Sequence, residues 1–247
     1  YTRVEVDALG LESQHRAAAA IAEGRFDRSL VTIHNDDGTV ALDHDEYPRP
    51  ETTAEGLAAL HPSFTKFVDF TFEQSDATMG ELMAQKYPGV ELHNVHHAGN
   101  SSGVVDGAGA VLVSSPDYAA AHGLTPRARI VMSAVAADEP LIMLTAPGPA
   151  ANKCLERAGM TVDDIDLFEV NEAFASVVLR FFRDTGADPL KVNVNGGAIA
   201  LGHPIGATGT MLIGTLLDEL ERRDLQTGLV AMCTGGGMGT ATIIERI

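Results

Sequence analysis

Helical and strand patterns alternate along the second half of the chain. Apolar positions with helical spacing occur at about 149–158, 172–184 and 206–222, and short apolar runs typical of strands lie at 128–136, 167–170, 192–194, 228–232 and 240–245. Gly159 and Gly186 directly follow the first two helical stretches, where a left-handed residue commonly ends a helix. The alternation predicts an α/β fold with helices layered on a sheet. A glycine turn joins the last two strands, so we expect them to form a hairpin.

The chain begins with a different pattern. Thr2 and Glu5 match a capping box, which predicts a helix that reaches about Glu23. Two short strands, 30–33 and 39–42, are separated by an Asn-Asp-Asp-Gly turn and are expected to pair as a hairpin.

The middle of the chain is irregular. Residues 43–98 are acidic and rich in His and Pro, with short helices expected near 53–60 and 76–87. A stretch of this length is too long for a bare loop in a compact domain, so we interpret it as a lid-like cap segment. Beyond it, 106–113 runs into a predicted strand and 115–123 forms a predicted helix.

Composition narrows the class of protein. The 247 residues allow one large domain or two smaller ones. The formal net charge of −17 argues against nucleic acid as a partner, because phosphate binding requires a basic surface. No apolar run is long enough for a transmembrane helix, so membrane insertion is not expected.

The two cysteines and the first residues indicate the cellular setting. Cys154 lies in a helical pattern and is expected to be a small buried residue, and a disulfide with Cys233 is not expected. Nothing in the cysteine usage suggests a secreted scaffold, so we expect a cytoplasmic protein. The first residues do not resemble a signal peptide and lack an initiator Met, so we expect the chain to begin within a larger protein.

Candidate chemistry lies in two glycine-rich stretches, 195–209 and 233–239. The first carries His203 and the second begins with Cys233. Asn171 and Cys233 directly follow predicted strands, and His203 lies just before a predicted helix. Ligands collect at the carboxyl ends of strands in open α/β sheets, so we expect these three side chains to share a site. A neutral His and a Cys can both transfer protons, which favours an acid–base active site.

Structural roles are alternatives for each residue alone. Asn171 could cap a helix, His203 could be a loop histidine, and Cys233 could be a small core residue. The His93-x-x-His96-His97 cluster has no distinctive ligand spacing, so no metal site is predicted. The three main candidates together favour the catalytic interpretation.

The motifs that contain these residues resemble the thiolase family. Asn171-Glu-Ala-Phe, Gly202-His-Pro-Ile-Gly-Ala-Thr-Gly and Cys233-Thr-Gly-Gly-Gly-Met-Gly are similar to its three C-terminal signatures, and Gly99-Asn-Ser-Ser-Gly is similar to its loop before them. The resemblance covers the whole chain and is strongest to bacterial thiolases of fatty-acid and steroid side-chain β-oxidation. It implies layered α/β/α domains with a mixed sheet, plus a loop or cap domain.

The resemblance implies catalytic roles. His203 would activate a nucleophilic cysteine and, with Asn171 and a water, form an oxyanion hole. Cys233 would be the acid and base at the α-carbon, and the N–H of Gly235 would contribute to a second oxyanion hole.

The resemblance also implies binding roles. Coenzyme A would be a co-substrate, with no permanently bound cofactor. The residues implied to contact it or the acyl group are Ser102, Ala98, Ala173, Phe174 and Met143.

The family's nucleophilic cysteine lies in an N-terminal region that has no counterpart here. The resemblance therefore implies part of the loop domain at 1–103, the closing elements of a first domain at 104–124 and a complete C-terminal domain at 125–247. It also implies a homodimer or homotetramer, or a complex with a β-oxidation hydratase or dehydrogenase subunit.

Three functions remain open from the sequence. The first is the C-terminal part of an enzyme that cleaves 3-ketoacyl-CoA with coenzyme A or condenses acyl groups in reverse. The second is a truncated, non-catalytic binding or assembly protein. The third is a condensing enzyme of fatty-acid or polyketide synthesis, which would favour a second His where Cys233 stands. We favour the first, because a binding module has no need of both His203 and Cys233.

Overall fold

The C-terminal half of the chain folds around a mixed four-stranded sheet. The computed structural model describes residues 1–73 and 75–247; Gln74, in the predicted cap segment, lies outside the described residues. The strands are β3 (Ala128–Ala137), β4 (Leu167–Val170), β5 (Thr227–Thr234) and β6 (Met238–Arg246), in the order β3-β6-β5-β4. β4 and β5 are parallel and the other neighbours are antiparallel, which confirms the predicted C-terminal hairpin.

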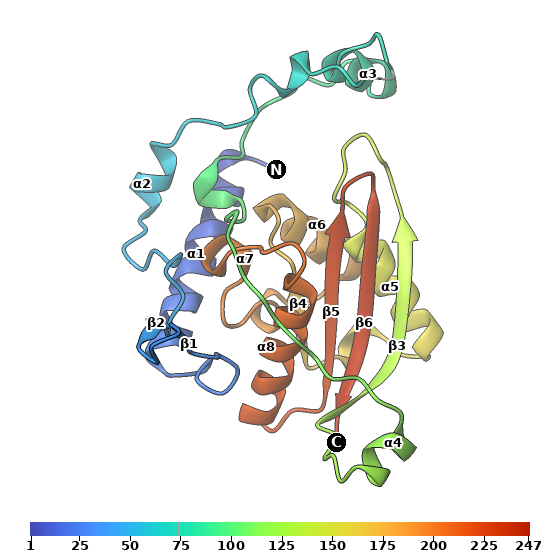
Figure 1. Cartoon of the computed structure of the whole chain (residues 1–247). Coiled ribbons are helices and arrows are strands. Elements are labelled where there is room, and N and C mark those ends of the chain that lie inside the picture. Colours follow the sequence, from blue (N-terminus) through green and yellow to red (C-terminus); the bar gives the residue numbers. More distant parts are fainter. Residues whose placement is uncertain (74) are drawn as a thin grey trace.

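Helices cover both faces of this sheet (Figure 1). Helices α5 (Pro147–Ala158) and α6 (Ala175–Thr185) pack on one face, and α8 (Thr208–Arg222) packs on the other. The α/β prediction is confirmed, since the alternating pattern gave each helix one apolar side to bury.

Strand β4 shows why its sequence is a continuous apolar run. Side chains alternate between the two faces of a strand. Phe168 and Val170 join the core beneath α5 and α6, whereas Leu167 joins the core beneath α8. All four residues of β4 are buried, as expected for a strand with helices on both sides.

The N-terminal half consists of one long helix and peripheral elements. Helix α1 (Arg3–Ala22) begins at the Thr2 capping box, which confirms that prediction. The other elements before the sheet are β1 (Ile33–His34), β2 (Val40–Leu42), α2 (Ala54–Ala58), α3 (Met79–Lys86), α4 (Pro116–Ala121) and single turns of 3-10 helix at Phe67–Asp69 and Ala98–Asn100. The C-terminal half also contains α7 (Ala198–Leu201) and the 3-10 turns Val162–Asp164 and Pro189–Lys191. Figure 1 shows α2 and α3 lying away from the sheet, on the cap segment. No helix in the described part of the chain is both long and apolar enough to cross a membrane.

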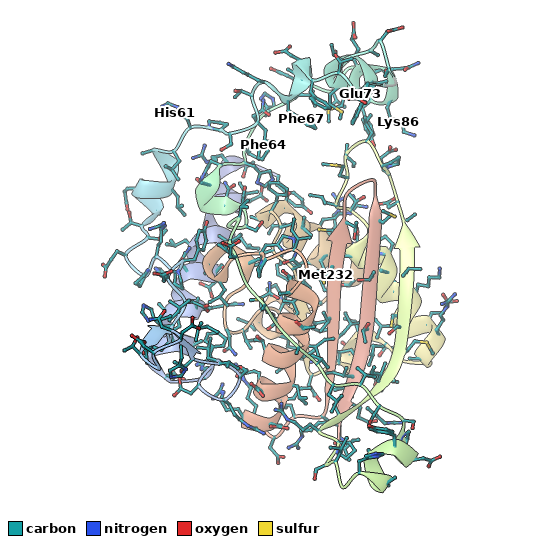
Figure 2. The ribbon with its side chains drawn as sticks, in the orientation of Figure 1. His61, Phe64, Phe67, Glu73, Lys86 and Met232 are labelled. Atoms are coloured by element: carbon teal, nitrogen blue, oxygen red, sulfur yellow. The ribbon has the colours of Figure 1, made fainter. Side chains whose placement is uncertain are left out.

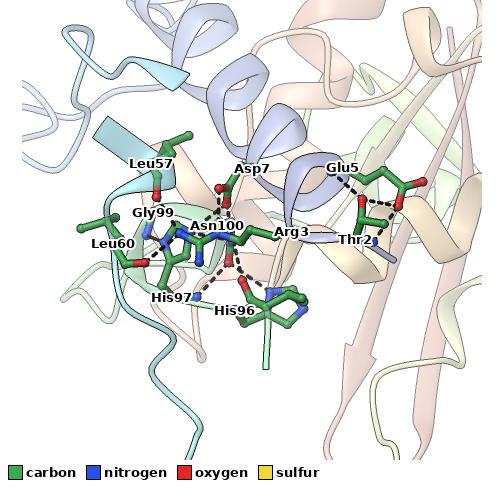
Figure 3. Close-up of polar contacts among 11 residues, drawn as sticks. Thr2, Arg3, Glu5, Asp7, Leu57, Leu60, His96, His97, Gly99 and Asn100 are labelled. Atoms are coloured by element: carbon green, nitrogen blue, oxygen red, sulfur yellow. Dashed lines mark hydrogen bonds and ion pairs between the residues drawn. The ribbon is translucent and has the colours of Figure 1, made fainter. Parts of the chain in front are cut away.

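A buried polar cluster ties the end of the cap segment to α1 (Figure 3). The Asp7 carboxylate accepts hydrogen bonds from Arg3 Nε at 2.7 Å, His97 Nε2 at 2.8 Å and Asn100 Nδ2 at 2.7 Å. His97 Nδ1 accepts from the Gly99 N–H at 3.0 Å, which places the ring proton on Nε2. The cluster fixes the turn that leads from the cap segment into the site.

Two predicted strands are wrong. Residues 106–113 form no strand in the portion that the structure describes; they cross the start of α8, where Gly107 lies against Pro204. A strand requires a neighbour that completes its backbone hydrogen bonds, and no described segment offers one here. The predicted strand 192–194 is reduced to single bridges, one of them from Val192 to Phe168.

Candidate active site

Asn171 and His203 lie in contact at one end of the sheet. Asn171 directly follows β4, and its N–H donates to the Ala231 carbonyl of β5 at 3.0 Å. Its fully buried side chain places Nδ2 at 3.4 Å from His203 Nε2. The helix-cap alternative for Asn171 is wrong, because α6 begins at Ala175 and Phe174 occupies the cap position. The carboxamide therefore contacts the histidine and does not cap the helix.

The His203 ring is fixed by a short loop between α7 and α8. Gly202 has φ of +89°, which a residue with a side chain adopts only with strain, and this bend turns the chain toward the site. The His203 N–H donates to the Gly103 carbonyl at 2.9 Å, and Nδ1 lies 2.7 Å from Thr208 Oγ1. Burial lowers the pKa of the imidazole below its ordinary value, so the ring is neutral at neutral pH and can accept a proton.

Cys233 lies at the end of β5, against an apolar wall. It forms a buried cluster with Ala173 and Val177, and Leu144 and Phe174 pack against that cluster. Burial raises the pKa of this thiol to about 11, so the group is a protonated acid at neutral pH. Such a thiol can deliver a proton to a carbanion that forms beside it.

Cys154 serves a different purpose from Cys233. It lies on α5 and is fully buried in the main core, which confirms its prediction as a small core residue. Both cysteines are free thiols.

The predicted binding residues fall into two groups. Ser102 and Ala173 lie on two segments that run side by side, and Met143 and Phe174 line a cavity. The Ser102 N–H donates to the Ala173 carbonyl at 3.0 Å, so the loop before 104 lies alongside the residues after Asn171. Met143 and Phe174 line the same cavity of about 420 Å³. Phe64 and Phe67, on the cap segment between α2 and α3, also line it (Figure 2), and the Phe64 ring packs edge-on against the Phe174 ring with 5.6 Å between the ring centroids.

Two predicted site residues lie at exposed positions. Gly235 belongs to the turn 235–237 that joins β5 to β6, two residues beyond Cys233. Ala98 is the exposed first residue of the 3-10 turn Ala98–Asn100. Asn171 thus lies in contact with His203, and Ala173 packs in the same cluster as Cys233. Gly235 and Ala98 lie at the exposed edge of the site.

The structure adds one residue, Leu144, that the sequence pattern did not indicate, next to the expected Met143. Met143 and Leu144 have φ of 49° and 56°, a conformation rare for residues with side chains. Leu144 packs against the cluster that contains Cys233, and Met143 lines the cavity. Strained backbone of this kind concentrates at functional sites, but no sequence signal marks it at a non-glycine residue.

The histidine cluster before Ala98 has structural partners. His97 is held by Asp7, and His96 Nε2 lies 2.9 Å from Ser176 Oγ. Within residues 1–73 and 75–247, no three His, Cys, Asp or Glu side chains gather closely enough to hold a metal ion.

Comparisons with known proteins point to one family. Residues 124–246 match the family model for "Thiolase, C-terminal domain", and residues 1–72 match "Thiolase, N-terminal domain". An acetyl-CoA acetyltransferase of Paracoccus denitrificans is 44% identical across 99% of this chain and 56% of its own length. A 3-ketoacyl-CoA thiolase of Aeromonas hydrophila is 43% identical across all of this chain and 59% of its own length.

A crystal structure shares the fold. Human mitochondrial 3-ketoacyl-CoA thiolase in complex with CoA superposes with a TM-score of 0.85 and 38% identity, over 100% of this chain and 55% of that chain. The chain thus spans little more than half the length of the relatives that it matches.

Proposed function

The chain belongs to the thiolase family, and from this premise we propose that the polypeptide containing it cleaves 3-ketoacyl-CoA with coenzyme A. The products are acetyl-CoA and a shortened acyl-CoA, and the reverse reaction is a Claisen condensation. The proposal rests on the contact between Asn171 and His203. The segment after Asn171 continues to Ala173, which packs in the same cluster as the protonated Cys233. The setting we propose is cytoplasmic β-oxidation of fatty acids or steroid side chains.

His203 has two tasks in the proposed reaction. Its neutral ring takes the proton of a nucleophilic cysteine thiol that lies outside these 247 residues. The resulting thiolate attacks the 3-keto carbon, and the bond between C2 and C3 breaks. The protonated ring and the Asn171 amide, through a water, then stabilise the enolate oxygen of the departing acetyl-CoA.

Cys233 completes both halves of the reaction. Its thiol protonates C2 of the enolate and releases acetyl-CoA. The Cys233 thiolate then takes the proton of an incoming coenzyme A thiol, whose sulfur attacks the acyl-enzyme and frees the nucleophile. Gly235 lies in the exposed turn two residues after Cys233. This position supports its N–H as a hydrogen-bond donor to the oxyanion that forms in the second step.

We propose binding roles for residues on the same neighbouring segments and on the cavity wall. Ser102 and Ala98 would contact the pantetheine arm of coenzyme A, and Ala173, Phe174 and Met143 would contact the acyl group. The cavity lined by Met143 and Phe174 supports this assignment, since Val177 and Phe174 line it and also belong to or pack against the cluster that contains Cys233.

The domain division and assembly are part of the proposal. We assign 1–103 to a loop or cap domain, 104–124 to the closing elements of a preceding domain and 125–247 to the C-terminal domain. Leu112 and Val113 are exposed on the unpaired segment, and pairing with strands of a longer polypeptide would bury them. A homodimer or homotetramer, or a complex with a hydratase or dehydrogenase subunit, is proposed as the working assembly.

A thiolysis assay on the full-length natural polypeptide tests the function. His203→Ala and Cys233→Ala should each lower kcat by about 10²-fold or more, the usual effect of losing a general acid or base. Cys154→Ala is the matched control, because it removes a buried thiol from the core of the sheet and should leave kcat within about threefold of wild type. Wild-type rates in either site variant, or an equal loss in the control, would exclude the proposal.

A further inference from the structure

The first residue of α8 holds the side of His203 that faces away from Asn171. Thr208 is 2% exposed, and its Oγ1 lies 2.7 Å from His203 Nδ1. The same Oγ1 lies 3.0 Å from the Pro204 carbonyl oxygen. The hydroxyl therefore has two polar neighbours, one of which can only accept.

Counting protons assigns the roles in this contact. A hydroxyl has one proton to donate, and the Pro204 carbonyl is its acceptor. The Thr208 oxygen is then left to accept, which requires a proton on His203 Nδ1. A neutral imidazole carries one N–H, so Nε2 has a free lone pair.

The other side of the ring is consistent with this assignment. Asn171 presents Nδ2, an amide nitrogen that only donates, at 3.4 Å from His203 Nε2. A proton on Nε2 would face this N–H group. Both neighbours of the ring are therefore satisfied by a single tautomer.

We propose that Thr208 is a positioning residue that holds neutral His203 in the Nδ1–H tautomer and leaves Nε2 as the base. Its catalytic consequence rests on the proposed thiolase function, whereas the tautomer is a property of the site alone. In the reaction, the thiol proton moves to Nε2, and the resulting imidazolium keeps its Nδ1–H on the Thr208 oxygen. The hydrogen bond also fixes the ring plane, so Nε2 stays directed toward Asn171 and the reacting groups.

Two substitutions separate the hydroxyl from the shape of the side chain. Thr208→Val keeps the β-branched volume and removes the hydroxyl, whereas Thr208→Ser keeps the hydroxyl and removes a methyl group. A structural role of the buried methyl would make Thr208→Ser the more harmful change. The tautomer proposal gives the opposite order.

The first measurement is the ¹⁵N spectrum of the full-length natural polypeptide labelled at histidine, with His203→Ala used to assign the ring signals. Wild type and Thr208→Ser should show a protonated Nδ1 and an unprotonated Nε2, and Thr208→Val should show an increased share of the Nε2–H form. An Nε2–H pattern in wild type overturns the proposal, even if Thr208→Val fails to fold. An unchanged pattern in folded Thr208→Val also overturns it.

The second measurement is thiolysis by the same proteins. Thr208→Val should lower kcat about 10- to 100-fold, as loss of a partner that orients a functional histidine commonly does, with KM changed less than about threefold. Thr208→Ser should restore kcat to near the wild-type value. A Thr208→Val variant with normal kcat overturns the positioning role. A wild type without thiolysis refutes the proposed function, and the ¹⁵N spectrum then still decides the tautomer.

Discussion

Ser13 on α1 holds together the two segments that carry Asn171 and His203. The buried Ser13 hydroxyl donates to the Glu172 carboxylate at 2.6 Å and accepts from the Gly197 N–H at 3.1 Å. Glu172 directly follows Asn171, and Gly197 opens the loop that leads to His203. Replacing Ser13 with Ala removes both hydrogen bonds while leaving the helix backbone intact.

The magnitude follows from the groups left behind. A hydrogen bond to a charged group contributes about 1.5–3 kcal/mol, and a buried N–H left without a partner costs about 1–3 kcal/mol. The higher helix propensity of alanine offsets roughly 0.5 kcal/mol of this loss in unfolding free energy. The free energy of unfolding of Ser13→Ala should therefore fall by about 2–5 kcal/mol.

Urea unfolding of the full-length natural polypeptide, followed by circular dichroism, measures this change. Ser29→Ala is the control: its hydroxyl donates to the Phe26 carbonyl at 3.3 Å near the surface, so the free energy of unfolding should change by less than about 0.5 kcal/mol. Equal losses in the two variants, or a loss below about 1 kcal/mol for Ser13→Ala, would refute the reasoning.

Three further outcomes are expected. Gly197→Ala places a Cβ against the Glu172 carboxyl group, so it should lower the unfolding free energy by about 1–3 kcal/mol in the same urea assay, and a neutral result would contradict the close approach. Burial opposes ionisation of Glu219, but hydrogen bonds led by Arg222 lower its pKa to about 2. Its contribution to stability is therefore complete above about pH 4.5 and lost toward pH 2, and Glu219→Gln should flatten this part of the curve of Tm against pH. Alkylation of Cys233 by iodoacetamide should rise about tenfold per pH unit between pH 8 and 10, because burial raises the thiol pKa to about 11, and a plateau near pH 9 would contradict that pKa.

Local signals explain which parts of the fold could be predicted. The Thr2 capping box, the glycines at 159 and 186 and the glycine turn before β6 act within a few residues, and all fall at the predicted element boundaries. The same reasoning failed over 106–113, because a run of small and apolar residues forms a strand only when a partner strand is present.

The sequence by itself determined the order of the main helices and of the four strands in the C-terminal sheet, and the chemical types at the site, because periodicity, turn chemistry and motif identity are local properties. Tertiary structure alone decided the contact of Asn171 with His203, the left-handed backbone at Leu144 and the hydrogen bond from His203 to Thr208. Each of these features depends on which distant segments come into contact, or on backbone strain that the surrounding packing imposes. The spacing of residues along the chain does not specify such contacts or such strain. The most local of these contacts, between His203 and Thr208, required the loop to fold back before a hydroxyl five residues away could select a tautomer.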